Sequence, residues 1–127
     1  MDVATKEMII DYKNDLQFAN IIDFVLKTCI NLESLHIKIG LCFEINNNIT
    51  EPIYLTENSN LINITISDND YKLDYRHYEI FKILIDRNRK NLKSLALYNC
   101  DASLLTNCGV INMITSLTLS DCYNITK

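Results

Sequence analysis

The sequence predicts one α/β domain over residues 1–127, a curved solenoid with short parallel strands on its concave face and helices on its convex face. Three observations support this prediction. A nine-residue apolar motif recurs along the chain, its copies start at roughly regular intervals, and amphipathic helical segments separate some of them. In a solenoid each repeat packs only against its neighbours, so a short motif can specify the whole architecture.

The recurring motif has Leu or Ile at its first, fourth and sixth positions. Four copies occur, at Leu32–Gly40, Leu61–Asn69, Leu92–Cys100 and Ile114–Cys122, and the last three carry Asn or Cys at the ninth position. Their starts at 32, 61, 92 and 114 are 29, 31 and 22 residues apart. Solenoid repeats built on a short Leu-rich motif usually have a period of about 20–29 residues, so the 31-residue interval is slightly long. An Asn also directly precedes the first three copies. These residues are Asn31, Asn60 and Asn91.

The middle of each copy alternates between apolar and other residues, as in Leu35-His36-Ile37. A period of two places the apolar side chains on the buried face of a strand and the intervening ones on the opposite face. We therefore expect four strands that pair in parallel, about 4.8 Å apart. Leu95 and Leu117 are expected to point into the core.

Between the strands, apolar residues recur at helical spacing. Residues 14–29 and 75–89 are expected to form helices, and a shorter helix is expected near 102–107. The linker at 40–59 contains Pro52 and is expected to lack a long helix. The residues expected on the buried helix faces are Leu16, Ala19, Ile22, Val25, Leu26, Cys29, Tyr78, Phe81, Leu84, Ile85 and Asn88.

One further segment, Ile80–Asn88, also matches the motif. It starts only 12 residues before Leu92, which is too close for a repeat unit. Its apolar residues also fit one face of a helix. We therefore assign it to the second helix rather than to a strand.

The outward positions of the strands are predicted to line up as a concave binding surface for a protein ligand. Tyr98 and His36 are the expected anchors, because Tyr is frequent among residues that dominate binding energy. The alternative is that small polar side chains only solvate this face. The candidate binding residues are His36, Lys38, Thr65, Ser67, Tyr98, Thr118 and Ser120.

The last motif copy continues as Cys122-Tyr123-Asn124-Ile125-Thr126, and Leu92–Cys100 has the same Cys at its ninth position. This pattern resembles the C-x-x-I-T signature of cysteine-containing leucine-rich repeats, which are typical of F-box substrate adaptors. The resemblance covers about residues 14–127. It implies a leucine-rich repeat solenoid that acts like the substrate-recognition region of a ubiquitin-ligase adaptor.

Composition narrows the function classes. The net charge of −4 argues against a general nucleic-acid binder, and no apolar run has the length of a transmembrane helix. The five cysteines include no C-x-x-C pair, and Cys100, Cys108 and Cys122 match no zinc-ligand spacing. We therefore predict a reduced, cytoplasmic protein with no metal, no cofactor and no catalytic residue.

Two alternatives to a binding module remain. A cysteine hydrolase would use Cys108 with His77, although nothing in the sequence activates that thiol. A self-associating scaffold would use the edge after Cys122, where no polar capping repeat is visible and marginal stability is expected. The uncapped end is expected to mean that the chain is a fragment, that it self-associates there, or that it is a degenerate member of the family.

A cluster of basic residues ends the second predicted helix. We interpret it as a solvated helix end that complements the helix dipole, and contact with RNA or an acidic partner is the alternative. The cluster consists of Arg87, Arg89, Lys90 and Lys93.

Overall fold

The computed structural model describes residues 4–12, 18–39, 60–68, 75–100, 102–105 and 114–123. Its strands form one parallel sheet in which each strand pairs with the next one in the chain. The strands are β1 (Glu7–Tyr12), β2 (Ser34–Ile39), β3 (Asn63–Asp68), β4 (Ser94–Tyr98) and β5 (Ser116–Ser120). The predicted α/β class and the parallel pairing are confirmed.

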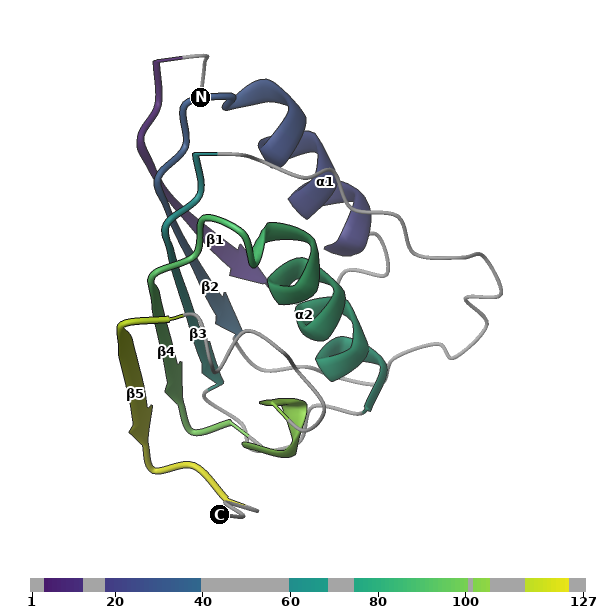
Figure 1. The fold of residues 1–127 in the computed structure, drawn as a ribbon. Helices are drawn as coiled ribbons and strands as arrows, with labels where there is room; N and C mark the ends of the chain where they lie inside the picture. Colours follow the sequence, from purple (N-terminus) through teal and green to yellow (C-terminus); the bar gives the residue numbers. More distant parts are fainter. Residues whose placement is uncertain are drawn as a thin grey trace.

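Both α-helices lie on the same face of the sheet (Figure 1). They are α1 (Phe18–Thr28) and α2 (Tyr75–Asn88), and a short 3₁₀ helix, η1 (Ala102–Leu105), follows β4. Among the described residues, no helix covers the opposite face, which we call the outer face. Residues 13–17, the linker 40–59 and the end of the predicted 102–107 helix lie outside the described residues.

Successive strands begin with the same backbone arrangement. The carbonyl oxygen of Lys6 accepts hydrogen bonds from the backbone N–H groups of Glu33 and Ser34. The carbonyls of Glu33, Ile62 and Lys93 each accept the equivalent pair from the next strand, and all eight N···O distances lie between 2.8 and 3.1 Å. Four strand-to-strand steps therefore start with one repeated geometry, as expected when consecutive segments fold as equivalent units.

Strand β1 corrects the predicted number of strands, because the described residues form a five-stranded sheet where four strands were expected. Thr5, Met8 and Ile10 occupy the first, fourth and sixth motif positions, but the sequence pattern required Leu or Ile there. Met8 is the register partner of Leu35, and Ile10 is the partner of Ile37. The segment is therefore an additional, degenerate copy of the motif that starts 27 residues before Leu32.

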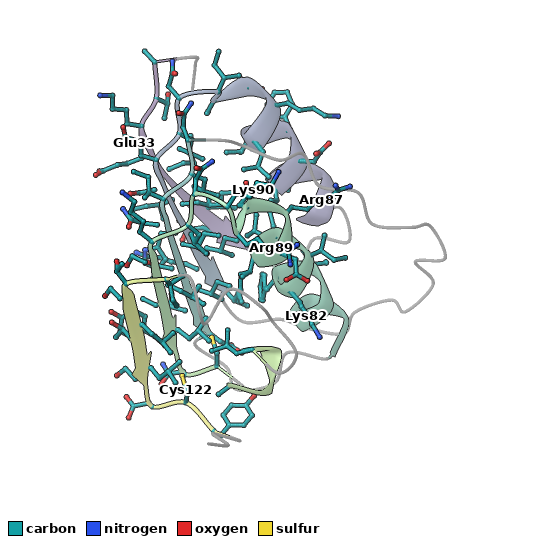
Figure 2. The ribbon with its side chains drawn as sticks, in the orientation of Figure 1. Glu33, Lys82, Arg87, Arg89, Lys90 and Cys122 are labelled. Carbon is teal, nitrogen blue, oxygen red and sulfur yellow. The ribbon has the colours of Figure 1, made fainter. Side chains whose placement is uncertain are left out.

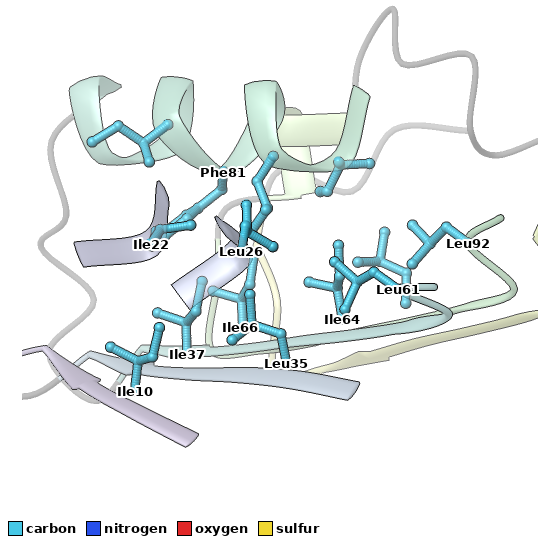
Figure 3. Packing of buried hydrophobic residues seen from close by; sticks show 14 of the residues in the cluster. Ile10, Ile22, Leu26, Leu35, Ile37, Leu61, Ile64, Ile66, Phe81 and Leu92 are labelled. Carbon is cyan, nitrogen blue, oxygen red and sulfur yellow. The ribbon is translucent and has the colours of Figure 1, made fainter. Parts of the chain in front are cut away.

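The core lies between the helices and the inner face of the sheet (Figure 3). Phe81 of α2 and Ile22 and Leu26 of α1 are buried against Ile37 and Ile66 of the strands. The predicted helix faces are confirmed wherever side chains are described. The buried members are Ile22, Val25, Leu26, Cys29, Phe81, Leu84, Ile85 and Asn88. The motif match at Ile80–Asn88 is helical, as assigned.

The expectation that Leu117 is buried is wrong. Leu117 is 41% exposed, whereas its register partner Leu95 is 0% exposed. The alternation of the sequence places Leu117 in line with Leu95, but β5 is an edge strand of the sheet. Among the described residues, α1 and α2 cover β1 to β4 more fully than β5, and a side chain is buried only where another element covers it.

Candidate functional site

The outward side chains of neighbouring strands are in register and form three rows across the outer face. The middle row contains His36, Thr65 and Thr118, and the next row contains Lys38, Ser67, Tyr98 and Ser120. All seven candidate binding residues therefore lie on one face. The complete rows are Glu7, Ser34, Asn63, Ser94 and Ser116, then Ile9, His36, Thr65, Ala96 and Thr118, then Asp11, Lys38, Ser67, Tyr98 and Ser120.

The seven candidates differ in accessibility. Lys38, Tyr98 and Thr118 are exposed. The other four are half-buried, because neighbouring side chains on the face of the sheet shield one another. They are His36, Thr65, Ser67 and Ser120. An incoming ligand would meet the exposed set first.

Sequence reasoning missed the contribution of β1 to the outer face. Ile9 is the register partner of His36 and is 58% exposed, more than the 38% of Tyr98. Ile9 is therefore the more accessible of these two large side chains. The available signal was the Thr5, Met8, Ile10 pattern, which a search that accepted Met and Thr at motif positions would have found.

Two hydrogen bonds join outer-face side chains of neighbouring strands. His36 Nε2 and Ser67 Oγ are 3.1 Å apart, and Asn63 Nδ2 donates to Ser34 Oγ at 3.0 Å. These bonds link β2 to β3, so the centre of the face has fixed side-chain positions. A prepositioned surface loses less conformational entropy when a ligand binds.

Partial burial lowers the pKa of His36 below its ordinary value of 6.5, and the nearby Lys38 lowers it further. Asp11 on β1 acts in the opposite direction. The lowering effects dominate, so the imidazole is neutral at pH 7. Its hydrogen bond with the Ser67 hydroxyl is then a bond between two neutral groups.

Charge is unevenly distributed over the outer face. The outward residues of β3, β4 and β5 carry no charge, and most of them are Ser or Thr. The charged outward residues are Glu7 and Asp11 on β1 and Lys38 on β2. The face therefore combines a hydroxyl-rich neutral area with a charged end.

The turns after β4 and β5 have equivalent conformations. Asn99 and Asp121, both at the eighth motif position, have φ angles of 58° and 53°. Asn and Asp adopt this left-handed region more readily than most residues, because their short side chains can bond locally to the backbone. The chain thereby makes two tight turns without glycine.

The cysteine at the ninth position also makes equivalent bonds in both repeats. The thiol of Cys100 donates to the carbonyl of Ile66 with Sγ···O of 3.5 Å, and that of Cys122 donates to the carbonyl of Leu97 at 3.3 Å. Ile66 and Leu97 both occupy the sixth position of the preceding motif copy. Cys100 is fully buried, whereas Cys122 is half-buried at the edge of the sheet.

Burial, together with the neighbouring Cys122 and Asp68, raises the pKa of the Cys100 thiol to about 12. A thiol with such a pKa carries almost no thiolate at pH 7, and the thiolate is the reactive form. Cys100 therefore has a structural role and is not a reactive nucleophile. Cys108 lies outside the described residues, as does the side chain of His77, so the hydrolase alternative stays a prediction.

The Asn that precedes the motif has a structural role that the sequence did not reveal. Asn60 Nδ2 donates to the carbonyl oxygen of Ile30 with a distance of 2.8 Å. Ile30 occupies the corresponding turn of the preceding repeat, so this amide connects adjacent turns. The bond gives Asn60 a structural role that requires a side-chain donor.

Within the described residues, no group of His, Cys, Asp or Glu side chains is arranged to hold a metal ion. Among the same residues, no helix has the length and apolar character needed to cross a membrane. Comparisons of the chain with protein-family models, with curated proteins and with solved structures gave no match.

Proposed function

We propose that this chain is a leucine-rich repeat solenoid whose function is to bind a protein ligand on its outer face. The observation that supports this function most directly is the register of the strands, which aligns outward side chains in three rows on a face that no described helix covers. Solenoids with this layout use the strand face as an extended binding surface.

The repeat geometry supports the solenoid assignment. The bifurcated backbone bonds at the strand starts, the positive φ angles of Asn99 and Asp121, and the thiol bonds of Cys100 and Cys122 recur at equivalent motif positions. Backbone hydrogen bonds, turn dihedral angles and side-chain bonds that recur together in this way are typical of units that arose as copies of one structural repeat.

The chemistry of the outer face favours a protein ligand. Ile9 and Tyr98 offer exposed apolar area, and the Ser and Thr side chains between them offer hydrogen bonds at fixed positions. An interface of this composition, with apolar contacts among satisfied polar groups, is typical of protein recognition. A charged ligand such as a polynucleotide would find no cations on β3 to β5.

A peptide-display selection against the whole chain tests this proposal. Peptides selected on the wild type are expected to bind Tyr98→Ala at least about tenfold more weakly, because an exposed aromatic residue in the contact area is a frequent hot spot. The matched control is Phe24→Ala. Phe24 is also aromatic, is 57% exposed, and lies on α1 at the opposite face.

The result that would contradict the proposal is selected peptides that lose affinity for Phe24→Ala and keep it for Tyr98→Ala. Binding would then occur on the helical face. A failure to select any peptide, with the chain folded by circular dichroism, would also count against an outer-face binding module.

The C-x-x-I-T resemblance supports a more specific role, namely that of the substrate-recognition part of an F-box-type adaptor in the cytoplasm. Among the described residues, no disulfide joins Cys29, Cys100 or Cys122, which is compatible with such a reducing compartment. Co-purification of a ubiquitin-ligase component with the chain is the expected result. Its absence would contradict the adaptor role and leave the binding surface itself untouched.

A scaffold that assembles end to end is the second candidate, because β5 is an edge strand with Leu117 exposed. Edge strands with accessible apolar side chains favour pairing with another chain. Sedimentation velocity over a range of concentrations would show assembly, and Leu117→Lys is expected to abolish it. A wild type that sediments as a monomer at every concentration would exclude this candidate.

A further inference from the structure

Four exposed cations lie at the end of α2 and in the turn that leads into β4. They are Arg87, Arg89, Lys90 and Lys93, here called the basic patch. Figure 2 shows the first three around the C-terminal half of α2 and the turn after it. Within the described residues, none of the four forms an ion pair, whereas Lys27 of α1 pairs with Asp23 at 2.9 Å.

The charge of this segment is opposite to that of the rest of the chain. Residues 86–93 contain the four cations and Asp86, which gives a net charge of +3. Because the whole chain has a net charge of −4, the remaining residues carry −7. The basic patch is therefore a local positive field on an acidic protein, and such a field attracts anions selectively to one place.

The end of α1 shows that the fold does not require this charge. Its last turn holds one cation, Lys27, and the turn that follows has Cys29 and Ile30 where the second turn has Arg89 and Lys90. Both turns lead into a buried first motif residue, Leu32 in one case and Leu92 in the other. One cation is enough to complement a helix dipole, and closely spaced like charges repel one another. The additional cations are therefore not needed to complete the helix end, and they are accessible to an anionic ligand.

We propose that the basic patch binds an acidic segment of a partner protein. Arg and Lys pair with carboxylates through charge-assisted hydrogen bonds, and Arg87 and Arg89 can each do so in a bidentate manner. A short acidic segment can remain on the patch. A long polyanion such as a nucleic acid would extend over the rest of the chain, whose charge of −7 repels it.

This site is separate from the outer face and does not depend on the function proposed above. The patch belongs to α2 and to the turn before β4, whereas the outer-face rows are formed by the strands. A variant of the patch therefore leaves the outer-face residues in place, and either proposal can fail without the other.

Fluorescence anisotropy with a labelled polyglutamate peptide and the whole chain tests the proposal. The triple variant Arg87→Glu, Arg89→Glu, Lys90→Glu is expected to weaken binding at least about tenfold, since several exposed ion pairs are lost together. The control variant Lys6→Glu, Lys13→Glu, Lys27→Glu has the same net charge as the patch variant and keeps all four residues of the basic patch. It is expected to retain wild-type affinity within about threefold, and wild-type binding should weaken with salt because surface charges are screened beyond about 8 Å at physiological ionic strength.

Three outcomes would overturn the proposal. The first is that the wild type fails to bind polyglutamate at low salt, and the second is that both triple variants lose affinity equally. The third is that a single-stranded oligouridylate binds the wild type more tightly than polyglutamate does and binds the patch variant more weakly. The last result would identify nucleic acid as the ligand. Circular dichroism checks that each variant is folded. If the triple variant is unfolded, the neutral variants Lys90→Gln and Arg89→Gln are measured in the same way. Each is expected to lose less affinity for polyglutamate than the triple variant, while the control variant keeps its affinity.

Discussion

Leu95 on β4 and Leu117 on β5 are register partners, yet Leu95 is fully buried and Leu117 is 41% exposed. The two side chains have the same position in the motif and point to the same side of the sheet. They differ because Leu95 lies on an interior strand within the core cluster, whereas Leu117 lies on an edge strand of the sheet. Burial, and with it the contribution to stability, therefore depends on the place of the repeat in the stack.

This pair gives a matched test of the packing. Leu95→Ala is expected to lower the free energy of unfolding by about 3 kcal/mol, because it removes buried methyl groups and leaves a cavity. Leu117→Ala is expected to cost less than about 1 kcal/mol, because a half-exposed side chain loses little burial. Urea denaturation followed by circular dichroism measures both. Equal losses for the two variants would mean that β5 is covered as fully as β4.

The same pair shows what the sequence can and cannot predict. The alternation within the motif correctly predicted the strands β2 to β5, their register and the outward direction of the candidate residues, because side-chain direction follows directly from strand geometry. It could not predict the exposure of Leu117, since coverage depends on other elements. It also missed β1 and Ile9, because Thr5 and Met8 stand where the motif requires Leu or Ile.

The thiols of Cys100 and Cys122 make equivalent bonds but are expected to differ in reactivity. The pKa of Cys100 is raised to about 12 by burial and its neighbours, and the side chain is fully buried, whereas Cys122 is half-buried at the edge. We expect iodoacetamide at pH 8 (about the ordinary range of thiol titration) to alkylate Cys122 well before Cys100. Peptide mass mapping over time measures the two rates in one sample. In urea the rates should become similar, and rapid native alkylation of Cys100 would contradict its structural role.

Replacing Asn99 with glycine is expected to leave the stability of the chain almost unchanged, whereas replacing it with alanine is expected to lower that stability. Its φ of 58° is a left-handed conformation that costs an ordinary L-residue about 1–2 kcal/mol. Asn99→Ala should therefore destabilise the chain by about 1 kcal/mol, while Asn99→Gly should remain within a few tenths of the wild type. Thermal unfolding compares the two variants. If alanine is tolerated as well as glycine, the turn does not have the left-handed geometry.

Asn60 is expected to stabilise the chain through its bond to the carbonyl of Ile30, which lies 30 residues earlier. Asn60→Ala removes the donor and should lower the free energy of unfolding by about 1 kcal/mol. Asn60→Asp is the informative companion, because it keeps the shape but replaces the donating amide with an acceptor. It should destabilise at least as much as alanine at neutral pH. Equal stability of wild type and both variants in urea would show that the amide bond contributes nothing.

His36 is expected to make the stability of the chain depend on pH. Its pKa is lowered in the folded state by partial burial and by Lys38, against the opposing effect of Asp11, so the unfolded state binds a proton at a higher pH than the folded state does. Folding is therefore favoured above the ordinary pKa of 6.5, and this contribution is lost as the pH falls from 6.5 towards the lower folded pKa.

His36→Gln, which keeps hydrogen-bonding capacity towards Ser67 but does not titrate, should lose that part of the pH dependence. The difference between the wild-type and His36→Gln unfolding free energies across this range isolates His36 from His77 and from the carboxylates. An NMR titration of the His36 imidazole provides the direct measurement, and a midpoint above 6.5 would show that Asp11, rather than burial and Lys38, controls the site.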